Sequence, residues 1–242
     1  MGSQCRVVTS ITLRATMGRK RALLFAIPPL ILLLVTILLK LANPAHASWP
    51  SDILGTFGFT VVLPLTALVI GTSVLGAEID DGTVIHLLAT PVPRWLVIAS
   101  KYAVATVLTM LFAALPELVG GLIATGGATK LAMGVFAGAL AGSVAYNAIF
   151  VMISVTVPRA IAVGLAYVLI WEALLGNLVS GARLLSVGQY SLSVANAIAH
   201  DPALNARISL STAAVMGVFV TAAALVVAAH RLASFAIKGD PA

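Results

Sequence analysis

The sequence predicts an all-α integral membrane protein. Of its 242 residues, 60% are hydrophobic and only 9% are charged, and the mean hydropathy is +1.09. A soluble domain is about half apolar and about a quarter charged, so this chain has too little polar surface to cover a globule in water. The apolar residues form continuous runs and do not alternate as they do in membrane barrels, which makes helices the predicted element.

Six apolar runs are long enough to cross a bilayer, which takes about 20 residues per helix. Ala, Val, Leu and Gly dominate these runs, and small residues let membrane helices approach one another closely. Together the runs predict a single transmembrane domain over residues 1–242. The predicted spans are 23–41, 57–77, 102–123, 131–157, 160–179 and 210–229.

The basic residues predict which ends of the spans face the cytoplasm. With the N-terminus inside, ten Lys and Arg residues lie on the cytoplasmic side and four lie outside, namely Lys40, Lys130, Arg183 and Arg207. Cytoplasmic segments are the richer in Lys and Arg, so both termini are predicted to be cytoplasmic. This bias also accounts for the net charge of +6, and no nucleic-acid partner is expected.

Two segments outside the predicted spans leave alternatives open. Residues 1–21 are basic, and form either an amphipathic helix on the inner membrane surface or a partly ordered tail. A cleaved signal peptide is disfavoured, because the apolar run 22–39 exceeds the usual signal core. Residues 183–209 are more apolar than a solvated loop needs, so they form either an external loop or re-entrant helices buried against protein.

The predicted cytoplasmic segment 78–94, between the second and third spans, is unusually acidic. It holds Glu78, Asp80 and Asp81, which are three of the eight carboxylates in the chain. Asp80-Asp81-Gly82 is typical of a helix start, where carboxylates interact well with the positive end of the helix dipole. Pro91 then ends the helix. A short helix is therefore predicted between two spans.

This short helix would have one apolar face. Val84, Leu87 and Leu88 follow the i, i+3 and i+4 spacing that places side chains together on a helix. Such a face can dock into a groove on a soluble partner. The alternative is a solvated turn that only joins the two spans.

The same segment resembles the loop between spans two and three of ABC-2-type transporter permeases. The shared features are an acidic pair, Gly-Thr, Leu-Leu-Ala-Thr-Pro and a following basic residue. A basic segment before the first span, the Trp171-Glu172 pair in the fifth and a long segment before the sixth also agree with that family. His86 departs from the pattern, since many relatives carry Glu or another polar residue there.

The resemblance implies a permease subunit of an ATP-driven exporter in the bacterial cytoplasmic membrane. Two permease subunits, identical or similar, would form the pathway for a drug, antibiotic, peptide or lipid. Two separate ATPase subunits would use ATP and Mg, and the loop would be the coupling helix seated in an ATPase groove, with residues 1–21 as a second contact. The implied contact residues are Glu78, Asp80, Asp81, Gly82, Thr83, Val84, Leu87, Leu88, Thr90, Pro91 and Arg94.

No ATP site is expected on this chain. A phosphate loop requires Gly-x4-Gly-Lys followed by Ser or Thr, because its amides and Lys hold the phosphates. The nearest run joins Gly121 to Gly126, and Gly127 stands where Lys is required. The run also falls in a predicted external loop and is interpreted as a turn. The chain is therefore expected to bind no cofactor or metal of its own and to be no enzyme.

Two carboxylates, Glu117 and Glu172, fall inside predicted spans. A charge at mid-membrane depth costs about 2.5–3.5 kcal/mol on insertion scales, so such residues usually face the bundle interior or water. They are candidates for a transport pathway or a conformational switch; the alternative is a structural hydrogen bond between helices. Weaker candidates, more typical of bonds between helices, are Tyr146, Asn147, Tyr167, Asn177 and Gln189.

Two other functional classes fit less well. A secondary transporter or channel would need ion-coupling residues within the bundle, where only two carboxylates are available. An intramembrane enzyme could use Ser180 as nucleophile and His230 as base, but these are predicted to lie on opposite sides of the membrane.

Overall fold

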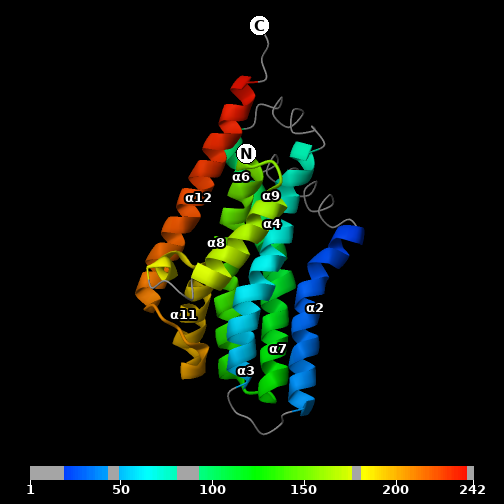
Figure 1. Ribbon diagram of the computed structural model, residues 1–242, viewed down its shortest axis with the longest axis vertical. Coiled ribbons are helices and arrows are strands. Elements are labelled where there is room, and N and C mark those ends of the chain that lie inside the picture. The colour runs from blue at the N-terminus through cyan, green and yellow to red at the C-terminus, as the bar shows by residue number, and fades with distance from the viewer. Residues whose placement is uncertain (1–18, 43–48, 81–92, 176–180, 239–242) are drawn as a thin grey trace.

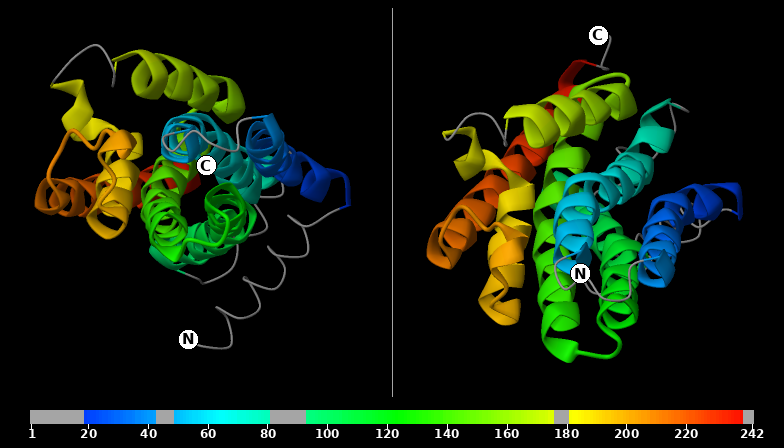
Figure 2. Two further views of the ribbon diagram at one scale, coloured as in Figure 1. Left: turned by 90° about the horizontal axis from the view of Figure 1, so that it is seen from below. Right: turned by 60° about the horizontal axis from the view of Figure 1, so that its bottom comes forward.

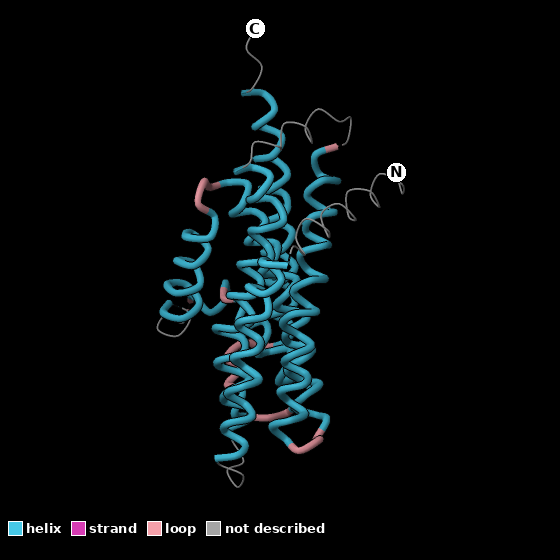
Figure 3. The backbone as a smooth tube through the Cα atoms, turned by 90° about the vertical axis from the view of Figure 1, so that its right-hand side faces the viewer, coloured by secondary structure: helices cyan, strands magenta, loops and turns pink. Residues whose placement is uncertain are grey.

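The computed structural model describes residues 19–42, 49–80, 93–175 and 181–238, and within these ranges the chain is an elongated helical bundle (Figure 1). The all-α fold is confirmed. Five continuous helical stretches are long and apolar enough to cross a membrane, and a shorter apolar stretch covers Ala160–Leu174. The connections that are described lie mostly at the ends of the bundle (Figure 3).

Several of the long stretches combine α-helix with π-helix. The first is α2 (Arg19–Ala42), and the second joins α3 (Trp49–Asp52), η1 (Ile53–Val62) and α4 (Leu63–Asp80). The third joins α6 (Arg94–Thr109), η2 (Met110–Ala114) and α7 (Leu115–Thr125), followed by α8 (Thr129–Thr156). The remainder are α9 (Ala160–Ala166), η3 (Tyr167–Leu175), η4 (Ala182–Leu185), α11 (Val187–Ala199), η5 (Pro202–Leu204) and α12 (Leu210–Lys238).

The directions of the helices agree with an alternating path through a membrane. Helices α2, α6 and α9 begin at the upper end of the bundle in Figure 1, and α4, α8 and α12 finish there. At the lower end, Lys40 near the close of α2 donates a hydrogen bond to the carbonyl of Ile123 in α7. The prediction that the upper end is cytoplasmic stays a prediction.

The structure corrects two predicted span edges. The second helical stretch begins at Trp49 and the third at Arg94, each eight residues before the predicted start. Lys101, one of the ten basic residues predicted to lie in cytoplasmic segments, therefore lies within α6. Its side chain is fully buried in the bundle, where Nζ donates to the carbonyl oxygen of Val74 at 2.8 Å. Satisfying its ammonium with protein oxygens lets a lysine continue an otherwise apolar helix.

A third correction concerns Asp80, which was predicted to begin a new helix. It is the last residue of α4, so the second-span helix runs further than its apolar composition indicates.

The central element of the bundle is α8, which packs against α4, α7, α11 and α12. Its face toward α11 carries Gly134, Gly138 and Gly142, and a Cβ added to Gly134 would lie 2.7 Å from the Ala195 carbonyl oxygen. Glycine is needed here because the backbones approach so closely. The α9–η3 stretch instead lies along the outside of the bundle (Figure 2).

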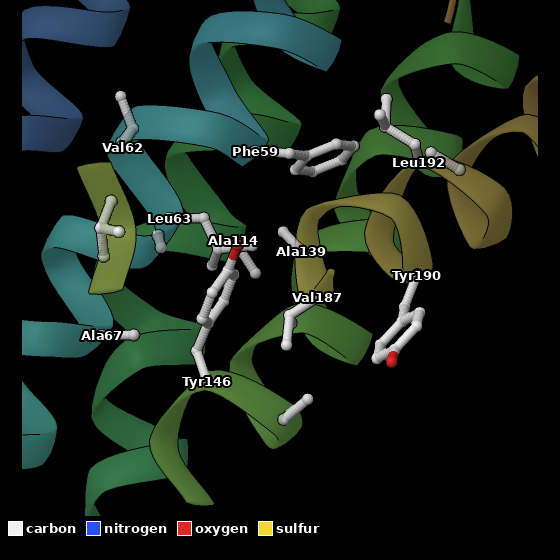
Figure 4. Close-up of a cluster of buried hydrophobic side chains, with 14 of the residues drawn as sticks. Phe59, Val62, Leu63, Ala67, Ala114, Ala139, Tyr146, Val187, Tyr190 and Leu192 are labelled. Carbon is white, nitrogen blue, oxygen red and sulfur yellow. The ribbon is translucent and has the colours of Figure 1, made fainter. Parts of the chain in front are cut away.

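Two clusters of buried side chains form the core. One is built around Tyr146 and Phe59, with Leu63, Ala114 and Val187 nearby (Figure 4). The other joins α4, α6, α8 and α12 through residues such as Ile70, Val104, Val151, Ala228 and Leu232.

Gly138→Ala tests the close packing of α8 on α11. The added Cβ would lie 2.5 Å from the Ser191 carbonyl oxygen and 2.8 Å from Cζ of Phe59. We expect the free energy of unfolding to fall by about 1–3 kcal/mol, measured by thermal unfolding of the purified protein in detergent. The control is Gly217→Ala in α12, where the nearest atom is Tyr190 Cδ2 at 3.7 Å. Equal stability of the two variants would contradict the packing.

Candidate functional site

Most of the predicted ATPase-contact segment falls outside the described residues. This applies to Asp81, Gly82, Thr83, Val84, Leu87, Leu88, Thr90 and Pro91, and also to Asn177 in the fifth span. Glu78 and Asp80 belong to the final turn of α4, and Arg94 opens α6. The predicted coupling helix therefore stays a prediction, while the helices that carry it are placed.

Those two helices are joined inside the bundle. Helices α4 and α6 pack against each other, and the Lys101 side chain of α6 donates to the Val74 carbonyl of α4. Around this bond lie Ile70, Leu75 and Ile98, all buried. Residues 81–92 connect the same two helices, so the bond joins the helices on either side of that connection.

The most extensive polar site in the described structure centres on Glu172 in η3. Its carboxylate is 4% exposed and accepts four hydrogen bonds. Oε1 accepts from the Val187 amide at 2.9 Å and the Tyr167 hydroxyl at 3.1 Å. Oε2 accepts from the Ser186 hydroxyl at 2.6 Å and the Gly188 amide at 3.3 Å. Glu172 thereby fastens the fifth-span helix to the first turn of α11.

The local sequence explains why α11 begins at this point. Ser186 is the N-cap, and its hydroxyl oxygen accepts from the Gln189 amide at 3.3 Å. The first amides of a helix have no partner within the helix, and they carry the positive end of its dipole. A carboxylate set against them is hydrogen-bonded and partly neutralised. The Ser186-x-x-Gln189 spacing, typical of a capping box, is the signal that would have located this site in the sequence.

The segment before the sixth span is thus helical along much of its length. Helix α11 buries Val187, Tyr190 and Leu192 and packs against α8 and α12. That accounts for the excess of apolar residues in 183–209. How deeply α11 enters a bilayer stays a prediction.

Glu117 is buried quite differently. It is fully inaccessible, and neither carboxylate oxygen has a hydrogen-bond partner among the residues that the structure describes. It packs directly on Gly58 of η1, where a Cβ would collide with the carboxylate. Pro116 precedes it at the start of α7, and the π-helix η2 lies immediately before that helix. Burying a carboxylate without hydrogen-bond partners costs free energy, so the packing of the surrounding helices must hold Glu117 in this position.

The three π-helices in the described ranges all lie beside these acids. Glu172 belongs to η3, Glu117 is the third residue after η2, and η1 supplies Gly58 to contact Glu117. Segments of π-helix inside longer helices are frequent at functional sites, because they redirect side chains and weaken the regular hydrogen-bond ladder.

The weaker polar candidates make contacts between or within helices. Asn147 Oδ1 accepts from Thr109 at 3.3 Å, and its Nδ2 donates to the Ser143 carbonyl at 2.8 Å. The Tyr146 hydroxyl has no hydrogen-bond partner in the described part of the chain, although it lies near Gly188, whose added Cβ would be 3.6 Å from Oη. The Tyr146 ring extends from α8 into the core cluster (Figure 4).

Beside Glu172 lies a cavity of about 230 Å³ that sequence reasoning did not anticipate. Its walls come from η1, from η3, from the start of α11 and from the connection to α12. The polar residues lining it are Thr56, Thr60, Glu172, Ser186, Gln189, Asn205 and Arg207, with Leu192 and Leu204 as apolar lining. Only Glu172 and Gln189 among these were candidates, because the threonines and Arg207 carry no pattern that distinguishes them in the sequence.

Comparison with known families decides the class. The sequence profile described as ABC-2 family transporter protein matches residues 18–179, which is more than half of the chain. The chain belongs to the ABC-2 transporter family. A search of curated proteins found no match.

Membership in the ABC-2 family makes the chain a multi-pass membrane subunit of an ABC transporter, whose family works with ABC ATPase subunits. The backbone at the end of the run that resembles a phosphate loop has the geometry of a turn. Gly126 and Gly127 have positive φ angles of 66° and 100°, and they separate α7 from α8.

Paired substitutions test the contrast between the two buried acids. In Glu172→Gln, whichever oxygen becomes an amide nitrogen, either Val187 or Gly188 loses its backbone acceptor. Leaving one such donor unsatisfied should lower the free energy of unfolding by about 1–3 kcal/mol. Glu117→Gln, which breaks no hydrogen bond, should cost less. Thermal unfolding in detergent measures both, and a larger loss for Glu117→Gln would contradict these assignments.

Proposed function

We propose that this chain is the permease subunit of an ATP-driven exporter. Two such subunits, identical or similar, form the pathway in a bacterial cytoplasmic membrane, and separate ATPase subunits bind ATP and Mg. The observation that carries the proposal is the ABC-2 family match over residues 18–179. The all-helical bundle and the Asp80–Arg94 sequence pattern support it.

The connection 78–94 receives the ATPase in this proposal. Its apolar residues Val84, Leu87 and Leu88 seat in a groove of that partner. The support comes from what the connection joins. Because α4 and α6 pack together and share the Lys101–Val74 hydrogen bond, a displacement of the connection moves both helices.

Movement then has a direct route into the bundle. Helix α4 continues without interruption into η1, which contacts Glu117 through Gly58 and lines the cavity through Thr56 and Thr60. A shift or rotation of this one stretch therefore changes the surroundings of both buried acids. The weakened hydrogen-bond ladder of a π-helix makes η1 a suitable place for such a change.

The double substitution Leu87→Asp and Leu88→Asp tests the proposed coupling. Two buried carboxylates in the contact would cost several kcal/mol, so ATPase binding and ATP-dependent transport should be lost while membrane insertion is kept. The measurements are co-purification of the ATPase and transport in membrane vesicles.

The matched control places two acids elsewhere on the same predicted helix. His86→Asp with Ala89→Asp adds equal charge on the face opposite Val84, Leu87 and Leu88. It should retain more ATPase binding than the leucine variant. If the leucine variant assembles and transports normally, the coupling-helix proposal is wrong.

A further inference from the structure

We propose that the cavity beside Glu172 is a recognition subsite for an oxyanion group, a phosphate or a carboxylate, of the transported molecule. The inference rests on the proposed export function only in that the ligand is a transported molecule, while the binding itself is a property of this chain alone. The support comes from the polar groups that line the cavity and from which of them already form hydrogen bonds.

The groups left available around the cavity are mainly hydrogen-bond donors. Gln189 is 7% exposed, and its Oε1 accepts from the Arg207 amide at 3.3 Å. Its Nε2 donates to no other described residue, and Gln189 is one of the residues that line the cavity. The Thr56 and Thr60 hydroxyls, likewise, have no hydrogen bond within the described part of the chain. They sit four residues apart in η1, and both line the cavity.

The lining of the cavity also includes a positively charged side chain. Arg207 lines the cavity, is itself exposed, and forms no ion pair with any described residue. Its guanidinium offers five N–H donors in a planar fork that matches the two oxygens of a carboxylate or phosphate. A neighbouring lining residue, Asn205, uses its Nδ2 to donate to the Ala203 carbonyl at 3.3 Å. The charged side chain that is available to a ligand is therefore that of Arg207, which is a hydrogen-bond donor.

The carboxylate of Glu172, which also lines the cavity, does not prevent an anionic ligand from binding. A carboxylate has about four acceptor sites, and Glu172 already accepts four hydrogen bonds. Two of the donors are amides at the start of α11, where the helix dipole offsets negative charge. Glu172 thus shapes the cavity and holds its walls together, and the free donors face a ligand that brings acceptors.

The volume sets how much of a ligand enters. Sites for whole drug-sized ligands are about 300–1,000 Å³, so a cavity of about 230 Å³ admits a head group and leaves a larger body outside. Leu192 and Leu204 supply the apolar wall against which the first carbons of that body pack. An amphipathic molecule with one anionic end fits this description.

Binding to the purified full-length chain in a neutral detergent, with no ATPase present, tests the inference. The probes are dihexanoyl phosphatidic acid, sn-glycerol 3-phosphate and hexanoate, with neutral dihexanoylglycerol as the comparison. We expect at least one anionic probe to bind and the neutral one not to. Binding of glycerol phosphate indicates a free head group, binding of phosphatidic acid alone indicates a lipid, and binding of hexanoate alone indicates a carboxylate.

Arg207→Gln should weaken that binding by about ten-fold or more, since it removes a charge-assisted hydrogen bond. Its backbone bond to Gln189 remains. Gln189→Leu should weaken it too. The matched control, Lys130→Gln, removes an equal charge from an exposed residue that does not line the cavity, and should bind like the unaltered protein.

Absence of binding by every anionic probe, equal binding of the neutral probe, or equal weakening by Arg207→Gln and Lys130→Gln would each overturn the inference. None of these results bears on ATPase coupling. Conversely, a chain that fails to assemble with an ATPase but binds an anionic probe through Arg207 would refute the exporter proposal and leave the oxyanion site standing.

Discussion

The hydrogen bonds of the Glu172 carboxylate hold the α9–η3 stretch, which lies on the outside of the bundle, to the start of α11. The carboxylate accepts hydrogen bonds from Tyr167 on its own helix and from Ser186, Val187 and Gly188 across the start of α11. This arrangement satisfies the Val187 and Gly188 amides, which have no partner within α11 because they lie in its first turn. It also sets where α11 begins, so that its small residues meet the glycine face of α8. The cavity beside Glu172 is a consequence of the same placement.

The second helical stretch connects this polar centre to the upper end of the bundle. Its α4 portion is bonded to α6 through Lys101, and its η1 portion touches Glu117 and lines the cavity. One continuous element therefore reaches from the proposed ATPase contact to both buried acids. Among the described residues Glu117 has no hydrogen-bond partner, so fewer hydrogen bonds hold its surroundings than hold those of Glu172. This difference makes the Glu117 side of η1 the part best suited to rearrange.

The sequence predicts the fold class well, because hydropathy alone requires the apolar runs to be helical inside a membrane. It predicts helix ends poorly, since Lys101 and Asp80 look like loop residues until a buried carbonyl or a continuing helix accommodates them. Glu172 is identifiable as a carboxylate in an apolar run, but its four donors come from tertiary contact with α11. The π-helices and the role of Arg207 leave no local signal, because both follow from how distant segments meet.

In the proposed mechanism a separate ATPase drives these helices through the connection between α4 and α6. Site-specific photo-crosslinking can detect that contact, with a photoreactive phenylalanine analogue replacing Leu87 of the full chain in intact cells and Lys130 as the comparison position. We expect an adduct from position 87 with a protein that carries a phosphate-loop sequence, and none from position 130. The same adduct from both positions, or none with an ATPase from position 87, would contradict it.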